Sequence, residues 1–227
     1  MAGIGISARP FALLALVGLM TALISCQGVE DPRPTPISGD GLQLLNATSG
    51  SLDVVVDGTT RAAALKASLA SDVIALAPGV HTVVLRASGA VAAQFSVTTA
   101  VGANRSAVAY ETGGGIAAGV LPDTGAVVPA GKSKVRVVNL AQNSSIDIWR
   151  TQPDFQTGIR FQFPFPYNPE PGPYFQSDAG EWSVWITPTS DWSQRLSELT
   201  LNVPSGERRT IAVVDSAGVL RLRVLVE

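Results

Sequence analysis

The stretch LQLLNATSGSLDVVVDG (42–58) has a second version later in the chain, VRVVNLAQNSSIDIWRT (135–151). Both run apolar-polar-apolar-apolar-Asn, then a polar gap, then aliphatic-Asp-aliphatic. The corresponding residues include Asn46 with Asn139, and Asp53 with Asp147. Two more blocks recur in the same order: APGVHTVVL (77–85) with DAGEWSVWI (178–186), and FSVTTAVGANRSAVAY (95–110) with LTLNVPSGERRTIAVV (199–214). Three collinear blocks predict two copies of one domain.

Each copy alternates apolar and polar residues between turn-forming residues, which is the pattern of half-buried strands. The expected inner set is Leu52, Val54 and Val56 in the first copy, and Trp182, Val184 and Ile186 in the second. Short strands about every 8 to 12 residues, with Gly and Pro between them, are typical of antiparallel sandwiches. The sequence therefore predicts an all-β protein of two tandem β-sandwich domains.

Two segments need a separate interpretation. The alanine-rich stretch 61–70 has local helix propensity, but the second copy has no helical pattern at that place, so we expect it to be extended or irregular. The glycine-rich stretch 113–134 separates the copies, with GIAAGVL (115–121) as a candidate edge strand of the first. The predicted boundaries are a first sandwich at 40–114, a linker at 115–132 and a second sandwich at 133–227.

The repeated blocks resemble a bacterial envelope family known as domain of unknown function 4397. The likeness rests on Val135-Arg136-Val137-Val138, on Leu52-Asp53-Val54 and on the strand PGVHTVVL (78–85). It covers most of 40–112 and, more loosely, 133–227, where IDIWRT (146–151) lacks the glycine turn of the family pattern. The resemblance implies an immunoglobulin-like sandwich and no established biochemical activity.

The N-terminus has the features of a lipoprotein precursor. Arg9 is the one charged side chain in residues 1–25, and the apolar run FALLALVGLMTALI (11–24) is short for a membrane span but suits a signal peptide. Leu23-Ile24-Ser25-Cys26 resembles the lipobox of bacterial lipoproteins, which implies cleavage before an acylated Cys26. The alternative is an ordinary secretory signal with an incidental cysteine. Residues 26–39, polar and proline-rich, are the expected tether.

This interpretation places the protein in the bacterial cell envelope, attached to a membrane by its N-terminal lipid. Gln27 follows the cysteine where an Asp would favour retention, so the outer membrane is the default destination in a cell with two membranes. The chain has 16 Lys and Arg against 18 Asp and Glu, and removal of Arg9 with the signal peptide leaves a net charge of −3. A nucleic acid partner is not expected, because such proteins carry a basic face.

No catalytic constellation is predicted. His81, the single histidine, corresponds to Trp182 on the inward face of its strand, so we expect it to pack near the strand end. Asp53 and Asp147 occupy equivalent positions in separate domains and are expected on the solvent side, not as a facing pair. LPDTG (121–125) matches the sortase signal LPxTG, but a whole domain follows it, so we interpret it as linker. The expectation is a protein that is not an enzyme, without metal or cofactor.

Aromatic residues are concentrated in the second copy. All four tryptophans lie between Trp149 and Trp192, and so does FQFPFPYNPEPGPYF (161–175), which we interpret as an insertion that the first copy lacks. Trp149 and Trp185 face outward by alternation. The candidate partner-binding residues are Trp149, Trp185, Phe163, Phe165, Tyr167 and Tyr174. In the alternative, the segment folds back and covers the two tryptophans.

These features predict a lipid-anchored envelope protein with a non-catalytic structural or partner-binding role. The alternative is a glycan-binding module that uses the aromatic residues of the second copy. An envelope protein or a glycan is the expected partner. The exposure of Trp149 and Trp185 separates the two, because a binding module needs them uncovered, whereas a scaffold would bury them.

Overall fold

The computed structural model describes residues 41–123, 127–142, 144–151, 159–189 and 191–226, with the side chains of 159–164 and 226 excepted. In this part of the chain all sixteen regular elements are strands. The first copy contains β1 (Gly41–Ala47), β2 (Leu52–Val56), β3 (Thr59–Leu65), β4 (Ile74–Ala75), β5 (Gly79–Ala87), β6 (Ala90–Thr99), β7 (Asn104–Thr112) and β8 (Gly115–Val120). The second contains β9 (Lys132–Asn139), β10 (Ser145–Thr151), β11 (Ile159–Pro166), β12 (Phe175–Asp178), β13 (Gly180–Pro188), β14 (Ser197–Val203), β15 (Arg208–Ser216) and β16 (Val219–Val226).

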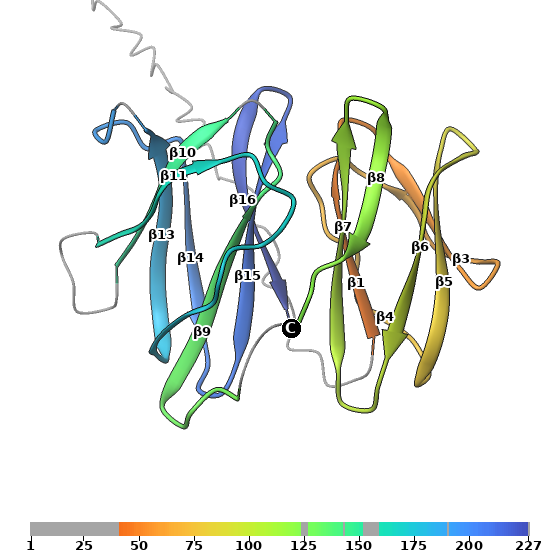
Figure 1. Ribbon diagram of the computed structural model, residues 1–227, viewed down its shortest axis with the longest axis horizontal. Helices are drawn as coiled ribbons and strands as arrows, with labels where there is room; N and C mark the ends of the chain where they lie inside the picture. The colour runs from red at the N-terminus through yellow and green to blue at the C-terminus, as the bar shows by residue number, and fades with distance from the viewer. Residues whose placement is uncertain (1–40, 124–126, 143, 152–158, 190, 227) are drawn as a thin grey trace, which may run out of the picture. The chain divides into compact units, whose positions relative to one another are not determined.

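The two copies share one topology (Figure 1). The first forms sheets of order β3-β2-β5-β6 and β4-β1-β7-β8, and the second forms β11-β10-β13-β14 and β12-β9-β15-β16. Each strand of the first copy therefore has its counterpart eight strands later. The predicted fold class of two tandem β-sandwiches is confirmed. One pair in each copy departs from an antiparallel arrangement, because β1 runs parallel to β7, and β9 to β15.

A buried asparagine at the end of the first strand explains why the repeated motif folds this way. The Asn46 amide donates to the carbonyls of Gly50 and Leu65, both at 2.8 Å, and its Oδ1 accepts from the Thr48 backbone N–H. Asn139 repeats the pattern, with Phe165 O at 3.0 Å and Ala141 N at 3.1 Å. Each asparagine thus ties its strand in one sheet to the edge strand of the other.

The edge strands β3 and β11 carry the same bulge, which makes the equivalent aspartates differ. The pairing of β2 with β3 skips from Leu52–Leu65 to Val54–Ala62, and Asp53 Oδ1 accepts the Ala64 N–H of the bulge at 2.8 Å. The expectation that both aspartates face solvent is wrong for Asp147, which is fully buried, whereas Asp53 is half-buried. The residue corresponding to Ala64 is Pro164, which has no backbone N–H to donate.

Each sandwich has its own apolar core. The first core includes Leu44, Val54 and Leu85, and the second includes Val137, Ile148 and Trp182. A third cluster joins outward-facing residues of β1 and β7 to those of β9, β15 and β16. Its buried members are Leu45, Val108, Leu121, Val138, Leu140, Ala212, Val214 and Leu225.

The link between the copies is shorter than the predicted 115–132. Residues 115–120 form strand β8 along β7, which agrees with the expected edge strand, and 61–65 lie in strand β3 rather than in a helix. The LPD part of LPDTG is fixed by burial and by ion pairs. Leu121 is 5% exposed, and the Asp123 carboxylate pairs with Arg105 at 3.3 Å and with Arg208 at 2.5 Å. Thr124 and Gly125 lie outside the described residues.

The segment 161–175 is not an insertion, so that interpretation is wrong. Its residues lie in β11, in the connection 167–174 and at the start of β12, which correspond to β3, the equally long connection 66–73 and β4 of the first copy. The alternating pattern hid the match because β11 contains prolines and the shared bulge. A longer connection occurs elsewhere: β5 and β6 are joined by Ser88 and Gly89, whereas β13 and β14 are joined by residues 189–196.

The predicted signal peptide, Cys26 and the tether lie outside the described residues. Among the residues that the structure describes, no helix has the length and apolar character needed to cross a membrane.

Candidate binding surface

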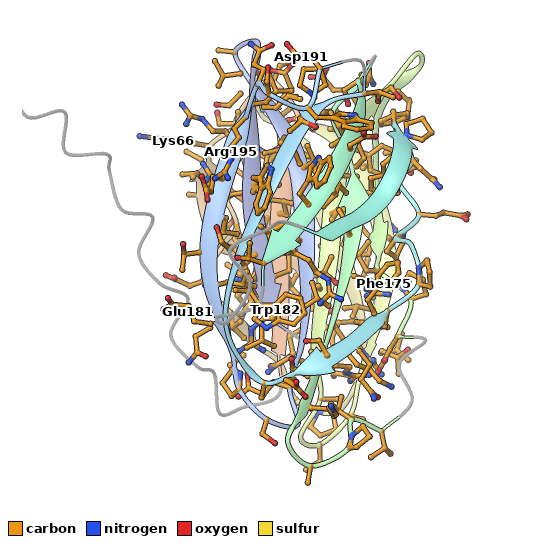
Figure 2. The ribbon with its side chains drawn as sticks, turned by 90° about the vertical axis from the view of Figure 1, so that its left-hand side faces the viewer. Lys66, Phe175, Glu181, Trp182, Asp191 and Arg195 are labelled. Atoms are coloured by element: carbon orange, nitrogen blue, oxygen red, sulfur yellow. The ribbon has the colours of Figure 1, made fainter. Side chains whose placement is uncertain are left out.

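The outer face of the β11-β10-β13-β14 sheet carries a row of tryptophans. Trp149 on β10 and Trp185 on β13 are direct cross-strand partners, and they alternate with core residues such as Ile148 and Ile186. Both therefore point away from the core, as predicted. We name this face, with Trp149, Trp185 and Trp192, the tryptophan face. Asp191 and Arg195, from the connection that follows β13, are labelled in Figure 2.

The rings of the tryptophan face form a row in which each ring contacts the next. Trp149 and Trp185 are stacked, with centroids 6.2 Å apart and planes 5° from parallel. The Arg195 guanidinium lies 4.3 Å from the Trp185 centroid, and Trp192 meets Trp149 at 5.8 Å and 64°. Aromatic and cation–π contacts of this kind contribute about 0.5–1.5 kcal/mol each beyond burial. The row is thus a packed unit, and Trp185 is only 7% exposed.

The connection 189–196 places Trp192 and Arg195 on this row. Asp191 N donates to Pro188 O at 3.2 Å, and Leu196 N donates to Ile186 O at 2.9 Å, so both ends continue the hairpin. Asp191 Oδ1 accepts from the backbone N–H of Ser193 at 3.0 Å and from its hydroxyl at 2.6 Å. These hydrogen bonds lower the pKa of Asp191, which therefore stays ionised. Trp192 is 57% exposed.

Polar side chains hydrogen-bond to Trp149 and Arg195 and orient them. Glu198 accepts from the Ser183 hydroxyl at 2.7 Å and from Arg195 at 2.7 Å, and the pKa of Glu198 is lowered first by the Ser183 hydrogen bond and then by Arg195. Trp149 Nε1 donates to Thr187 Oγ1 at 3.0 Å. Arg195 is therefore oriented at once by a carboxylate and by an indole face.

The other predicted binding residues do not join this surface. Phe165 is 4% exposed in the second core, where it has no exposed surface to offer a partner. Tyr167 points its hydroxyl at Glu111 O of the first copy, at 3.4 Å, and Tyr174 covers the guanidinium of Arg136 at 4.5 Å. Phe163 belongs to β11, but its side chain lies outside the described residues.

Trp192 and Arg195 are not among the binding residues predicted from the sequence. The available signal was the length of the connection, because the first copy has only Ser88 and Gly89 between the corresponding strands. Where the second copy has Trp149 opposite Trp185, the first has Val55 opposite Val84. Both differences fall on the same face, so the tryptophan face belongs to the second copy alone.

The His81 ring is held by two hydrogen-bonded neighbours. It lies on the inward side of β5, as predicted, but it is hydrogen-bonded rather than simply packed: Nδ1 is 2.7 Å from Asp57 Oδ2, and Nε2 is 2.7 Å from Ala77 O. Both neighbours are acceptors, which suits the doubly protonated ring. The Asp57 and Ala77 hydrogen bonds accordingly raise the pKa of His81, and the His81 hydrogen bond lowers the pKa of Asp57.

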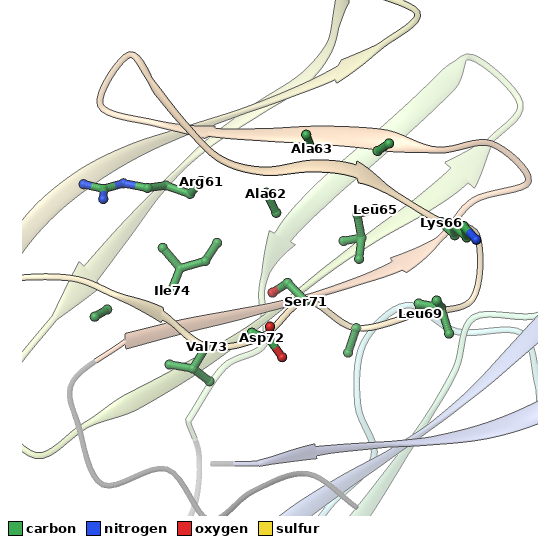
Figure 3. Close-up of a pocket in the computed structure, with 13 residues that line it drawn as sticks. Arg61, Ala62, Ala63, Leu65, Lys66, Leu69, Ser71, Asp72, Val73 and Ile74 are labelled. Carbon is green, nitrogen blue, oxygen red and sulfur yellow. The ribbon is translucent and has the colours of Figure 1, made fainter. Parts of the chain in front are cut away.

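An open groove lies between the edge strands of the first sandwich (Figure 3). It has a volume of about 680 Å³ and is lined by β3, by the connection after it and by β4. Most of the side chains that line it are small, with Ala62, Ala63 and Ala64 on one side. The exposed residues Arg61 and Lys66 lie at its border. In the described part of the chain, no group of three or more His, Cys, Asp or Glu side chains could hold a metal ion.

Comparisons with solved structures show weak likeness to two sugar-binding proteins. A streptococcal virulence factor described as binding alpha-glucan is 10% identical, with a TM-score of 0.27 over 81% of this chain and 96% of that one. The CBM26 module of Amy13K from Eubacterium rectale, solved with maltoheptaose, is 10% identical, with a TM-score of 0.29 over 83% and 97%. Scores this low carry no argument about the ligand. No curated protein matches the chain.

The family comparison agrees with the repeated motif. Residues 41–149 match the model described as Domain of unknown function (DUF4397), a span that contains the whole first sandwich together with β9 and most of β10 of the second. Residues 41–149, just under half of the chain, are thus similar to the DUF4397 family.

Proposed function

We propose that the protein is a lipid-anchored cell-envelope protein with a non-catalytic, partner-binding role, and that the tryptophan face is its binding surface. The observation that carries this proposal is the exposed Trp192, held on a connection that the first copy replaces with a two-residue turn. Exposed tryptophans mark binding surfaces because the ring offers a large contact area with little rotational freedom to lose.

The first copy serves as an internal control for this assignment. Both sheets have the same strand order, and the same cross-strand position holds Val55 and Val84 in one copy and Trp149 and Trp185 in the other. A fold requirement would act on both copies. The tryptophans and the longer connection are therefore additions to a fold that forms without them.

A non-catalytic role is supported by the state of the one histidine. Both ring nitrogens of His81 are engaged in hydrogen bonds, with Asp57 and with the Ala77 carbonyl, so neither nitrogen is open to a substrate as a general base must be. The fully buried Asp147 and the half-buried Asp53 belong to separate sandwiches, each at the bulge of its own edge strand.

A glycan ligand is the weaker candidate. Sugar rings bind against open aromatic faces, whereas Trp185 is 7% exposed, with Trp149 on one side and Arg195 over its ring. Of the three rings, Trp192 retains the exposure that such contact needs. A glycan partner is therefore kept as an outcome of the experiments below.

Metabolic labelling with a fatty-acid analogue tests the anchor. The wild type should be labelled, and Cys26→Ser should give an uncleaved, unlabelled precursor, because serine cannot form the thioether. An unlabelled wild type would reject the lipobox.

Cysteine accessibility tests the binding role without assuming the class of partner. Cys26 is the one cysteine in the sequence, so an introduced thiol is unique once Cys26 is acylated. Gln194→Cys places the thiol beside Trp192, and Ala90→Cys places a matched, exposed thiol on the corresponding hairpin of the first copy. In envelopes, a water-soluble maleimide should label residue 194 several-fold more slowly than residue 90, whereas in purified protein the two rates should be similar. Equal rates in envelopes would reject the tryptophan face as an occupied surface.

A further inference from the structure

We infer that His81 is a pH-sensitive latch at one end of the groove in the first sandwich: it holds the two groove walls together while its ring is doubly protonated, and it releases the β4 wall when the ring is neutral. The inference concerns the first copy and does not depend on the binding role proposed for the tryptophan face. It rests on the way the two walls are joined, on the two contacts of the ring and on the charges beside it.

The walls of the groove are joined differently at its two ends. One wall is β3, and the other is the connection after it together with β4. Figure 3 shows Lys66 and Leu69 at one end, where the chain itself passes from one wall to the other, and Arg61 and Ile74 at the opposite end. At that opposite end the walls are separate stretches of chain, so contacts between side chains and backbone decide how firmly they are held.

The His81 ring connects these two stretches. Its Nδ1 is 2.7 Å from Oδ2 of Asp57, which lies in the turn that leads into β3, and its Nε2 is 2.7 Å from the carbonyl oxygen of Ala77, two residues after β4. The Asp57 carboxylate is fixed in turn, because its Oδ1 accepts the backbone N–H of Thr82 at 2.9 Å. The ring therefore spans from the start of one wall to the end of the other.

Loss of one proton from the ring must break one of these contacts. A neutral imidazole has one N–H and one lone pair, whereas both of its neighbours here are acceptors. If the proton stays on Nδ1, it keeps the stronger, charge-assisted hydrogen bond to Asp57, and the Nε2 lone pair then repels the Ala77 oxygen. The other tautomer would set a lone pair against the carboxylate. The contact with Ala77 is therefore the one released.

The β4 wall has little else to hold it at this end. β4 has two residues, which pair with Gly41 and Leu42 of β1. The Ala77 oxygen keeps the hydrogen bond from Thr99 Oγ1 at 2.6 Å, so release loosens the wall without detaching it. The second copy has no such latch, because Trp182 stands in place of His81 and the corresponding strand β12 has four paired residues.

The groups beside the ring favour its protonated form. Among the described residues, the charged groups that act on the ring are Asp57, from the turn before β3, and Arg61, from β3 itself. The hydrogen bonds to Asp57 and Ala77 raise the pKa of His81 above 6.5, and they outweigh the opposing effects of burial and of Arg61. The latch is therefore closed below pH 6.5, and it opens as the pH rises through the folded pKa.

Hydrogen–deuterium exchange on the purified, acylated chain in detergent micelles tests the latch. Labelling at about pH 5.5 and about pH 8.5 brackets the ordinary histidine pKa, with labelling times scaled for the intrinsic exchange rate at each pH. We expect peptides that cover 74–80 to exchange several-fold faster at the higher pH. The matched peptides that cover 175–181 in the second copy should show no comparable change, because no histidine lies there.

His81→Gln is the variant that isolates the proton. Glutamine keeps an N–H donor but cannot become charged, so the difference between the two pH values at 74–80 should disappear. The inference is overturned by a pH dependence that persists in His81→Gln, or by wild-type peptides over 74–80 that exchange alike at both pH values.

An NMR titration of the same chain provides a measurement that needs no glutamine variant. His81 is the one histidine in the sequence, so its ring gives a single titration, which should have a pKa above 6.5 and the same midpoint as the exchange. Asp57→Asn keeps an acceptor beside Nδ1 but removes its charge, so both midpoints should move together toward 6.5. A wild-type ring that titrates at or below 6.5, or an exchange midpoint that stays in place while the ring's midpoint moves, would contradict the latch.

Discussion

The outer faces of the β3-β2-β5-β6 and β11-β10-β13-β14 sheets have the same strands in the same order, yet they differ in what they offer to a partner. The first presents Val55 opposite Val84 and closes with the turn Ser88-Gly89. The second presents Trp149 opposite Trp185, and residues 189–196 add Arg195 and the exposed Trp192. The duplicated fold is common to both, so the difference isolates what the second copy has gained.

The cores of the two copies differ at one strand end, and a substitution there should have the largest effect on the free energy of unfolding. Trp182 is 2% exposed in the second core with Arg150 4.5 Å from its ring, and its counterpart is the half-buried His81. Trp182→Ala should destabilise the protein by about 3–5 kcal/mol, because it removes a fully buried indole. Urea unfolding checks this value. A loss below about 1 kcal/mol would mean that the second core does not depend on the ring.

The shared asparagine should behave alike in both copies. Asn46→Ala and Asn139→Ala should each cost about 1–3 kcal/mol, since buried carbonyls of the edge strand lose their donor. Comparable losses in urea unfolding would support one folding rule for the two sandwiches. A loss confined to one variant would break the equivalence.

Much of the fold can be predicted from the sequence because the repeat is long and collinear. Alternation finds the inner residues and also the outward direction of Trp149 and Trp185. It fails at the β11 bulge, where the register slips: the segment 161–175 resembles an insertion, and Asp147 is buried rather than solvated.

The candidate surface is less predictable than the fold. Alternation gives the direction of a side chain but not what covers it, so the shielding of Trp185 by Arg195 is invisible in the sequence. Composition draws attention to the aromatic residues of 161–175, although Phe165 among them is a core residue. The exposed ring instead lies on a connection whose significance appears only when the strands of the two copies are matched.

Replacing the connection between β13 and β14 by the short turn of the first copy should make the second face resemble the first, with a small loss of stability. Replacement of residues 189–195 by Ser-Gly keeps Leu196, which packs against the second core. It removes one edge-to-face contact, one cation–π contact and the exposed Arg195–Glu198 ion pair, whereas the shorter loop recovers closure entropy, so the net loss should be about 1 kcal/mol. Acrylamide quenching of tryptophan fluorescence should increase relative to a Trp192→Phe reference, because Trp149 and Trp185 lose their cover. A loss of several kcal/mol would show that the connection is part of the fold.

The smallest effect concerns the first copy and depends on pH. The raised pKa of His81 adds stability that is complete below its unfolded value of 6.5 and is lost as pH rises through the folded value. The lowered pKa of Asp57 adds stability that is complete above its unfolded value of 3.8 and is lost as pH falls through the folded value. His81→Gln should therefore differ most from the wild type between about pH 4 and 6.5, and less at pH 8.5, in urea midpoints. A difference independent of pH would rule out the charged pair.

The most direct test of the tryptophan face is the ratio of maleimide labelling rates at residues 194 and 90, measured in envelopes with and without Trp192→Ala. Trp192 is 57% exposed and is not a member of the apolar clusters formed by the described residues, so this variant should fold like the wild type. We predict a ratio several-fold below that of purified protein when Trp192 is present, and a return to the purified value when it is alanine. A ratio that stays low without the ring, or that never falls with it, would contradict the account.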